Sequence, residues 1–451
     1  RSNPRDWDPW ACGLKRPRGA QEGDNDPVRT CISRDGGHNK AVVYLHGGSE
    51  LTRTDSTDRG CVLVVNGGSS SLKFAAYDAG GGLQCMLSGK FDRIGRPDAM
   101  LTVTDAGGRQ ELRAAMVATH AACVPVVSQL LRAAEVPLVV RAIGHRVVHG
   151  GNLYYEPRRI ADEVVTQLRR LSPFAPAHMP VQIALIESFG ECFSAVPQIA
   201  CFDTAFHRDL PRVARLLPIP RKYDAAGVQR YGFHGLSYTY LMRELERQAG
   251  AGAARGRIIL AHLGNGASMA AVRDGRSVDT TMAFTPAAGL VMSTRSGDLD
   301  PGVLEHLVET EGMTARQFCE MVHAKSGLLG VSEISSDVRD LLRLEAQDVR
   351  AAEAIALFCY QAKKWIGALT AALGGLDTLV FAGGIGENAP VIRARICDGL
   401  DYLGLRIDPA RNEISAPAIA TDDSRVAVRV IPTNEESLIA QTVVTMLAST
   451  D

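Results

Sequence analysis

A pattern of apolar run, glycine-rich polar turn and second apolar run occurs twice in this chain of 451 residues. The first copy covers residues 62–78 and the second covers residues 258–274. The two copies align at a constant offset, which places Asn66 opposite His262. Short apolar runs bounded by turn residues predict β-hairpins. Two similar hairpins about a domain apart predict a fold built from two duplicated domains.

The turn of the first hairpin, at residues 66–73, combines backbone N–H groups, serine hydroxyls and the ammonium group of Lys73. Bare amides and small side chains let anionic oxygens approach closely, which suits a phosphate group. The turn is not a Walker-type loop, because Lys73 lies on the second run and no helix opens behind it. Alone, it fits an ordinary tight turn equally well. The second copy favours two phosphate-binding turns that face a shared cleft.

Composition excludes several classes of protein. Lys plus Arg total 49 against 50 Asp plus Glu, which indicates neither a nucleic acid nor a membrane as partner. The ten cysteines form no CxxC pair, so we expect reduced thiols in a cytoplasmic protein rather than a zinc site or a disulfide framework. No apolar run reaches the roughly 18 residues that span a bilayer.

Residues 1–60 differ from the remainder, because they are rich in Arg, Asp, Gly and Pro and show little periodicity. We expect a mostly disordered extension outside the functional protein. The first methionine is Met86, beyond the first hairpin, so we expect a natural start at a non-Met codon near Val62 or upstream of Arg1. The sequence His46-Gly47-Gly48 could form a hydrolase oxyanion loop, but no Gly-x-Ser-x-Gly elbow accompanies it.

From Cys61 onward, predicted strands and helices alternate, which favours an α/β architecture. Strands are predicted at residues 62–66, 71–77, 101–104, 140–144, 198–202 and 378–382, with a second strand-rich block opening at 257. Helices are predicted at residues 115–134, 160–171, 180–190, 237–249, 301–309, 314–323, 337–343, 349–374, 389–400 and 435–448.

Five further stretches combine glycine turns with ionisable groups. Arg146 leaves a strand beside glycines, where it could bind a carboxylate or phosphate, or lie on the surface. Asp203 ends a strand, where it could contact a metal, water or proton, or cap a helix. His234 lies between glycines and aromatics, which favours a functional role. Arg295 lies in a polar loop that could also be merely solvated. The turn at 383–388 opens a helix whose amides suit a nucleotide, although its pattern is weakly specific.

Taken together and in order, these motifs resemble the acetokinase family, in the superfamily of acetate and sugar kinases, actin and heat-shock chaperones. The resemblance covers about residues 61–448 and rests on stretches 66–73, 144–151, 202–207, 231–235, 262–268, 294–302, 384–388 and 433–436. It implies an α/β fold of two duplicated actin-like, ribonuclease H-like domains with an interdomain active-site cleft. We expect one lobe at 61–205 together with a terminal helix at 436–451, and a nucleotide-binding lobe at 206–435.

The resemblance implies reversible transfer of the ATP γ-phosphate to acetate, giving acetyl phosphate and ADP, with Mg²⁺ or possible Mn²⁺, in a homodimer. It also implies roles for individual residues. The catalytic positions are matched by Asp203, His234 and Arg295. The positions for the small carboxylic acid are matched by Arg146, Val148, His178, Phe233 and Pro286. The metal positions are matched by Asn66 and Glu435. The positions for ATP or ADP are matched by Ser69, Ser71, Lys73, His262, Leu263, Gly264, Asn265, Gly266, Asp337, Val338, Arg339, Gly384, Ile385, Gly386, Glu387 and Asn388.

The role of Asp203 follows from the chemistry of the acceptor. Phosphoryl transfer between two anions needs neutralised charge and aligned groups, which two arginines, a histidine and Mg²⁺ supply. A carboxylate nucleophile is already ionised at pH 7, so it needs no strong base. We therefore interpret Asp203 as an organiser of water, Mg²⁺ or Arg146 rather than as an obligatory proton acceptor.

The chain departs from the family pattern at three places. Ala177 replaces a leucine of the acyl pocket, Tyr238 replaces a second histidine, and Ala288 replaces a glutamate. The smaller Ala177 predicts better use of propionate or butyrate, so a propionate or butyrate kinase is one alternative. A chaperone-like nucleotide switch of the same superfamily is a second, and an inactive relative is a third, which the retained motifs disfavour.

Overall fold

The computed structural model describes residues 28–35, 38–45, 59–80, 82–176 and 178–449. Residues 1–57 and 58–451 form separate units. In the first unit, β1 (Val28–Asp35) and β2 (His38–Leu45) pair as an antiparallel hairpin. The composition of residues 1–60 predicts little structure, so this hairpin is a feature that the sequence did not predict. The His46-Gly47-Gly48 sequence lies outside the described residues.

The second unit contains two sheets, and the first has the strand order β7-β6-β5-β4-β3-β8-β10-β9. Its strands are β3 (Arg59–Gly67), β4 (Ser71–Asp78), β5 (Cys85–Asp92), β6 (Met100–Asp105), β7 (Gln110–Ala114), β8 (Leu138–Val147), β9 (Arg158–Arg159) and β10 (Gln198–Phe202). Strands β3 to β7 form an antiparallel meander. Strands β8 and β10 continue the sheet parallel to β3.

The second sheet has the order β13-β12-β11-β14-β15. Its strands are β11 (Arg257–Leu263), β12 (Ala267–Arg273), β13 (Arg276–Thr280), β14 (Thr378–Ala382) and β15 (Ala427–Val430). Strands β11, β12 and β13 are antiparallel neighbours, whereas β14 and β15 run parallel to β11. The same order and directions hold for β5-β4-β3-β8-β10, so the duplication predicted from the hairpins is present in the topology.

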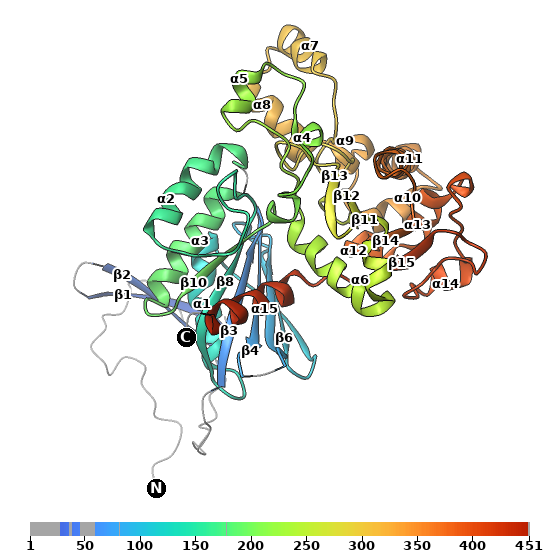
Figure 1. The fold of residues 1–451 in the computed structure, drawn as a ribbon. Coiled ribbons are helices and arrows are strands. Elements are labelled where there is room, and N and C mark those ends of the chain that lie inside the picture. Colours follow the sequence, from blue (N-terminus) through green and yellow to red (C-terminus); the bar gives the residue numbers. More distant parts are fainter. Residues whose placement is uncertain (1–27, 36–37, 46–58, 81, 177, 450–451) are drawn as a thin grey trace. The chain divides into compact units, whose positions relative to one another are not determined.

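Helices connect and cover these strands (Figure 1). The α-helices are α1 (His120–Arg132), α2 (Asp162–Leu171), α3 (Met179–Cys192), α4 (Arg212–Arg215), α5 (Arg221–Ala225), α6 (Gly235–Arg255), α7 (Gly302–Glu311), α8 (Ala315–Glu320), α9 (Gly327–Ser332), α10 (Val338–Leu344), α11 (Val349–Leu373), α12 (Gly383–Asn388), α13 (Pro390–Cys397), α14 (Pro409–Glu413) and α15 (Glu435–Ala448). The 3₁₀ helices are η1 (Ser172–Phe174), η2 (Ala205–His207) and η4 (Asp401–Leu403), and η3 (Met321–Lys325) is a π-helix.

Strand β3 lies at the centre of the first sheet and is buried on both faces. Leu63 and Val65 pack with Phe189 of α3. Val62 and Val64 face the opposite way and pack with Ile439 of α15. Successive side chains of a strand point to opposite faces, which explains why this strand is a continuous apolar run. The last helix of the chain therefore covers a face of the first sheet (Figure 1).

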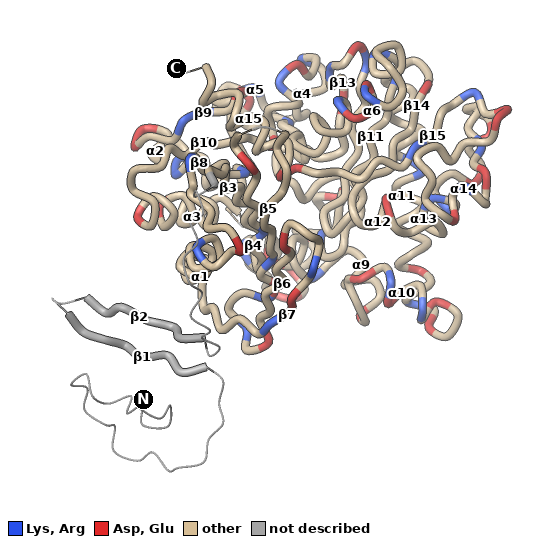
Figure 2. Tube along the Cα trace, turned by 90° about the horizontal axis from the view of Figure 1, so that it is seen from below, with Lys and Arg blue, Asp and Glu red and all other residues tan. Residues whose placement is uncertain are grey.

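Helix α6 contacts α15 on the first sheet and β11 of the second, so it connects the packing of the two halves. Acidic and basic residues are interspersed along the chain rather than gathered by sign (Figure 2). Within the part of the chain that the structure describes, no helix is both long and apolar enough to cross a membrane. The lobe boundaries predicted at residues 205 and 435 stay a prediction.

Candidate active site

Three neighbouring parallel strands end side by side and bring three of the predicted residues together. Asn66 lies near the end of β3, Arg146 near the end of β8, and Asp203 directly follows β10. The register pairs Cys201 with Arg146 in the parallel ladder between β10 and β8. Side chains at the carboxyl ends of parallel strands share one edge of the sheet, which is where open α/β sheets bind ligands.

Arg146 is held by hydrogen bonds on both sides of its guanidinium group. Its Nη2 donates to Asp203 Oδ2 over 2.6 Å, and its Nε donates to both oxygens of the same carboxylate at 3.1 and 3.2 Å. Its Nη1 donates to Asn66 Oδ1 at 3.1 Å. Asp203 is fully buried. Burial raises the pKa of Asp203 to about 6, against the opposing charge of Arg146.

The start of α15 adds two carboxylates to this edge. Asn66 Nδ2 donates to Glu436 Oε1 at 3.1 Å and to Glu435 Oε2 at 3.5 Å. Burial alone would raise the pKa of Glu435, but the charge of Arg146 and then those of His262 and Lys73 bring it below its usual value. Glu435 is thus an ionised carboxylate that accepts a hydrogen bond from the Asn66 amide.

This donor set fits Mg²⁺ better than a softer metal. Mg²⁺ prefers oxygen ligands and is often bound through one or two carboxylates, with water and substrate phosphates completing its shell. Among the residues described, no group of three or more His, Cys, Asp or Glu side chains is arranged to hold a metal. A metal beside Glu435 and Asn66 would therefore take its other ligands from water and phosphate.

On the opposite side of the site, His234 and Arg295 meet over the turn of the β11–β12 hairpin. A Cβ placed on Gly266 would lie 3.1 Å from His234 Nε2 and 2.9 Å from Arg295 Nη2. Only glycine leaves room for both groups at this point. The ring of His234 stacks on His262, with centroids 4.3 Å apart. Arg295 Nη1 donates to the carbonyl of Pro286 over 2.6 Å, which fixes its guanidinium group.

His234 occupies a strained backbone position at the start of α6. Its φ of 58° lies in the left-handed region, which is uncommon for residues other than glycine. The next residue, Gly235, donates its N–H to the Asp203 carbonyl at 2.9 Å, and a Cβ there would lie 2.1 Å from that oxygen. The loop that carries Asp203 and the helix that carries His234 are therefore locked together.

Mutual electrostatic effects show that the two sides are close. Burial and, to a smaller extent, the charge of Arg146 lower the pKa of Arg295 to about 10. Burial lowers the pKa of His178 to about 3, with contributions from Arg295 and Arg146. The structure thus gathers two cationic groups, Arg146 and Arg295, with the neutral imidazoles of His178 and His234 beside them. Such a region suits an anion that carries more than one negative charge.

The predicted nucleotide segments lie beside this region in the second sheet. A Cβ on Gly264, in the hairpin turn, would lie 3.8 Å from the backbone nitrogen of Gly384, so the hairpin turn and α12 are neighbours. The Glu387 carboxylate accepts hydrogen bonds from Gly383 N at 2.8 Å and from Thr433 N at 3.0 Å. This carboxylate therefore caps the start of its own helix.

Several predicted nucleotide contacts are limited by burial or pairing. The side chains of Leu263 and Val338 lie in the hydrophobic core, so only their backbone atoms remain for a ligand. Asp337 caps α10 and pairs with Arg339 at 2.6 Å, and the Arg339 side chain is 79% exposed. Ser69 and Lys73 are exposed, Ser71 is partly buried, and Asn265, Gly384 and Asn388 face solvent, as the surface of an open site requires.

The predicted acyl pocket is described in part. Val148 and Phe233 are buried, and Pro286 is buried beside the Arg295 contact. The Phe233 ring packs edge-on against His149, with centroids 5.6 Å apart. Ala177, on which the prediction of a wider pocket depends, lies outside the described residues.

Two residues that the sequence did not predict hold the strand ends in place. Gln182 of α3 accepts a hydrogen bond from Val148 N at 2.9 Å and donates to the Gly67 carbonyl at 3.2 Å. His120 Nε2 contacts the Gly68 carbonyl at 2.8 Å. Both come from helices distant in sequence, so no local motif could identify them. A polar residue on the buried side of an apolar helix, as at Gln182, is the one available signal.

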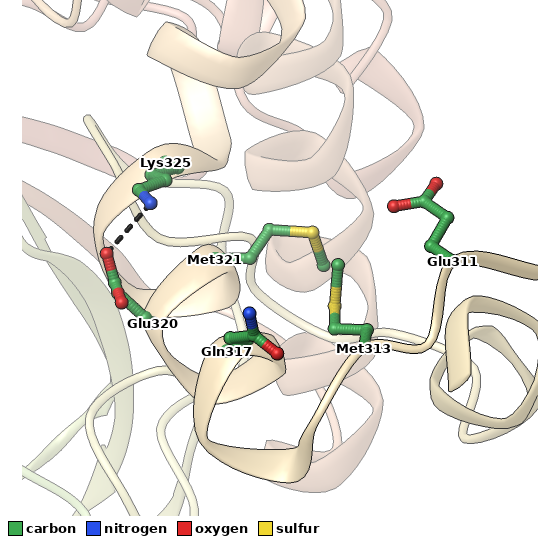
Figure 3. Close-up of a pocket in the computed structure, with 6 residues that line it drawn as sticks. All are labelled: Glu311, Met313, Gln317, Glu320, Met321 and Lys325. Atoms are coloured by element: carbon green, nitrogen blue, oxygen red, sulfur yellow. Dashed lines mark ion pairs between the residues drawn. The ribbon is translucent and has the colours of Figure 1, made fainter.

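Two surface pockets lie elsewhere in the second half of the chain. One, of about 300 Å³, is lined by Glu311, Met313, Gln317, Glu320, Met321 and Lys325, and an ion pair of 2.8 Å joins Lys325 to Glu320 (Figure 3). The other, of about 520 Å³, is bordered by α13 and α14. Neither is lined by a predicted site residue.

The chain is similar to known proteins over most of its length. The family model described as the acetokinase family matches residues 61–441. The acetate kinase of Rhodopseudomonas palustris (strain ATCC BAA-98 / CGA009) is 44% identical over 388 residues, which cover 84% of this chain and 96% of that protein. The propionate kinase of Citrobacter rodentium (strain ICC168) is 41% identical over 387 residues, covering 85% and 96%. The crystal structure of Porphyromonas gingivalis acetate kinase matches with a TM-score of 0.78 at 35% identity, covering 86% of this chain and all 100% of that one.

Proposed function

The chain belongs to the acetokinase family, and we propose that the residues gathered at the strand ends perform its reaction in the roles derived below. That reaction is reversible transfer of the γ-phosphate of ATP to acetate, which gives acetyl phosphate and ADP. The observation that carries the assignment of roles is the bond from Gly235 N to the carbonyl of Asp203, which joins the residue that holds Arg146 to the start of α6, where His234 lies beside Arg295.

Arg146 binds the carboxylate of the acid. Its guanidinium group is partly exposed while Asp203 and Asn66 hold it in place, so it is oriented before the substrate arrives. A preorganised cation loses little freedom on binding and therefore contributes more of its interaction energy. Asp203 acts through Arg146 as an organiser, which agrees with the fact that a carboxylate nucleophile needs no base.

His234 and Arg295 stabilise the phosphoryl group during transfer. Both point toward the glycine turn at Gly266, and Arg295 is fixed by the carbonyl of Pro286. Donors that are fixed where negative charge develops lower the barrier because they need no reorganisation. His178 lies close enough to both arginines for their charges to lower its pKa, and it borders the same anion.

Asn66 and Glu435 would hold Mg²⁺ together with water and the phosphates of ATP. When bound, this ion supplies positive charge to the phosphates that separate during transfer. Lys73, near enough to Glu435 to influence its pKa, contacts the same phosphates. The hairpin turn at 264–266 and the start of α12 bind the nucleotide through backbone groups, and the Asp337–Arg339 pair borders it.

The acid range is proposed to extend beyond acetate. Ala177 stands where the family pattern has leucine, so the pocket formed with Val148, Phe233 and Pro286 should accept one or two more carbons. The relative from Citrobacter rodentium that is named a propionate kinase supports variation of this kind within the family.

We also propose that the enzyme is a cytoplasmic homodimer. The homodimer follows from the family resemblance, and light scattering coupled to size exclusion tests it. The location is supported by the eight cysteines whose side chains the structure describes, which are all free thiols; proteins of oxidising compartments commonly carry disulfides instead.

A coupled assay of ADP formation tests the function directly. Acetate, propionate and butyrate are supplied separately with ATP and Mg²⁺, and a reaction without acid is the control. Acid-dependent ADP formation is expected, whereas a chaperone-like nucleotide switch would release ADP regardless of acid. His234→Ala and Arg295→Ala should each lower kcat by roughly 100-fold. Unchanged turnover in both variants would contradict the proposed roles.

A further inference from the structure

Behind His234 lies a buried hydroxyl pair that the reaction as described does not use. Tyr238 follows His234 by one turn of α6 and is fully buried. Its hydroxyl contacts Ser268 Oγ of β12, which is also fully buried. Ser268 Oγ in turn lies 2.8 Å from His234 Nδ1. Three polar side chains thus form one chain that ends at the imidazole.

Proton counting fixes the direction of this chain. Among the residues that the structure describes, Ser268 is the one hydrogen-bond partner of the Tyr238 hydroxyl. Tyr238 therefore donates to Ser268, because a buried hydroxyl proton without an acceptor is costly. Ser268 has a single proton of its own, and it donates that proton to His234 Nδ1. A neutral imidazole that accepts at Nδ1 carries its proton on Nε2.

The opposite direction leaves a donor unpaired. If Nδ1 carried the proton, Ser268 would donate to the Tyr238 oxygen, and the Tyr238 proton would then have no acceptor among the described residues. Burial, with the charges of His262, Arg146 and Arg295, holds the pKa of His234 well below its usual value, so the ring is neutral and its tautomer matters.

The nitrogen selected in this way faces the site. His234 Nε2 and Arg295 Nη2 both lie next to the position that a Cβ on Gly266 would occupy. In the Nε2–H tautomer the ring presents a donor beside the guanidinium group, which suits a phosphoryl oxygen. In the other tautomer it would present a lone pair, which repels that oxygen.

We propose that Tyr238 is a positioning residue which, through Ser268, holds His234 in the tautomer that donates from Nε2. This inference rests on the proposed role of His234 in phosphoryl transfer. Tyr238 itself touches no substrate.

The test is a kinetic double-mutant cycle of Tyr238→Phe and Ser268→Ala. Tyr238→Phe removes one oxygen and should lower kcat roughly fivefold, the value of one hydrogen bond, with both KM values changed less than twofold. Ser268→Ala should lower kcat at least as much. The double variant should match Ser268→Ala alone, since Tyr238 acts only through Ser268. Tyr240→Phe, which removes a hydroxyl from the same helix at a partly exposed position, is the matched control and should leave kcat unchanged.

A measurement on the unmodified protein covers the case in which Ser268→Ala does not fold. The ¹⁵N chemical shifts of the His234 ring distinguish a protonated from an unprotonated nitrogen, and they should show the proton on Nε2. A proton on Nδ1 overturns the inference, and so does an unchanged kcat in Tyr238→Phe. The inference also fails if Tyr238→Phe lowers kcat equally in the native protein and in the Ser268→Ala variant. If His234→Ala retains full turnover, the proposed role of His234 fails. If His234→Ala is impaired and Tyr238→Phe is not, only the present inference fails.

Discussion

At the scale of single residues, the orientation of Arg146 determines how the site binds the carboxylic acid. Its guanidinium group bonds to Asp203 through Nε and Nη2 and to Asn66 through Nη1, and Glu435 lies 3.5 Å away. Asp203 is wholly buried, whereas 20% of the surface of the Arg146 side chain is exposed. The carboxylate of Asp203 is therefore out of reach of substrate, and the remaining surface of Arg146 is what a substrate anion meets.

Replacement of Asp203 by asparagine tests whether it orients Arg146. The amide cannot accept two charge-assisted hydrogen bonds, so Arg146 loses its fixed orientation. We expect kcat to fall roughly 100-fold and the KM for acetate to rise, measured at saturating Mg²⁺ and ATP. Asp224→Asn, which breaks the ion pair with Arg212 near the surface, is the control and should leave both constants unchanged. Full turnover in Asp203→Asn would show that Asp203 has no essential role.

Ala177→Leu tests the width of the acyl pocket. Each buried CH₂ of a substrate contributes about 0.8 kcal/mol, which corresponds to about fourfold in kcat/KM. The native protein should therefore use propionate well, and the added leucine should lower kcat/KM for propionate and butyrate by at least this factor relative to acetate. Rates for the acids of two, three and four carbons give the comparison. A strict preference for acetate in the native protein would rule out a widened pocket.

At the scale of elements, α12 is short and depends on a residue outside it. Arg393 of α13 is fully buried and donates to the carbonyls of Gly386 and Glu387 at 2.8 and 3.0 Å. It also donates to the side chain and the carbonyl of Asn412 in α14. The last carbonyls of a helix need such partners when they are buried. Arg393 thus anchors the proposed nucleotide segment to the rest of its lobe.

Arg393→Met should weaken this anchor without touching the acid side of the site. The variant leaves several buried carbonyls without donors, which should lower the free energy of unfolding by roughly 3 kcal/mol. The KM for ATP should rise while the KM for acetate stays near its native value. Arg395→Met removes an exposed partner of Glu345 from the same helix and should cost less than about 1 kcal/mol. Equal effects of the two variants in urea unfolding and kinetics would contradict the anchor.

Sequence patterns predicted the long and buried elements best. The strand expected at 198–202 is β10 as observed, and the helix expected at 349–374 is α11 (Val349–Leu373). Strands β5, β7, β9 and β15 were not among the individually predicted strands. For β7, β9 and β15 the reason is that they are short and carry little apolar periodicity. The stretch 383–388 was interpreted as a glycine turn, yet it forms α12 once Glu387 and Arg393 satisfy its ends.

For the site as well, the sequence predicted features with a local signal and missed those that depend on tertiary contacts. Glycine turns marked Arg146, His234 and Arg295, because a turn that needs glycine is visible locally. Asp203 was anticipated as an organiser of Arg146, but the partners of His234 and Arg295 were not visible. Ser268 lies 30 positions from Tyr238, and only the packing of β12 against α6 brings their hydroxyls together. A hydrogen bond between distant elements depends on tertiary geometry, for which a single sequence carries no periodic signal.

At the scale of the whole molecule, stability in acid depends on buried histidines. His145, His149 and His207 are almost fully buried, and burial lowers the pKa of each to about 4. His145 contacts Gln198, His207 contacts Ser277, and His149 accepts from Gly151 N at 2.8 Å, so none has an acidic partner among these contacts. The unfolded chain binds protons at these sites from about pH 6.5 downward, whereas the folded chain does so only near pH 4. The stability that they contribute is therefore present above about pH 6.5 and is lost as pH falls.

The prediction is a loss of stability between pH 6.5 and 4. At pH 5 each histidine should cost roughly 2 kcal/mol of the free energy of unfolding. Asp203 acts in the opposite sense, because its pKa is raised to about 6 and the folded state keeps a proton that the unfolded state has lost. At pH 5 it should therefore offset roughly 1 kcal/mol of the stability that the histidines lose. Urea unfolding from pH 7.5 to 4.5 measures how the free energy of unfolding changes with pH.

His149→Phe should destabilise the protein at every pH. Its free energy of unfolding should nevertheless fall less steeply with pH, by about the contribution of one histidine, since the phenyl ring cannot be protonated. A stability that stays constant down to pH 5, or an unchanged slope in His149→Phe, would contradict the burial of neutral imidazoles as the cause.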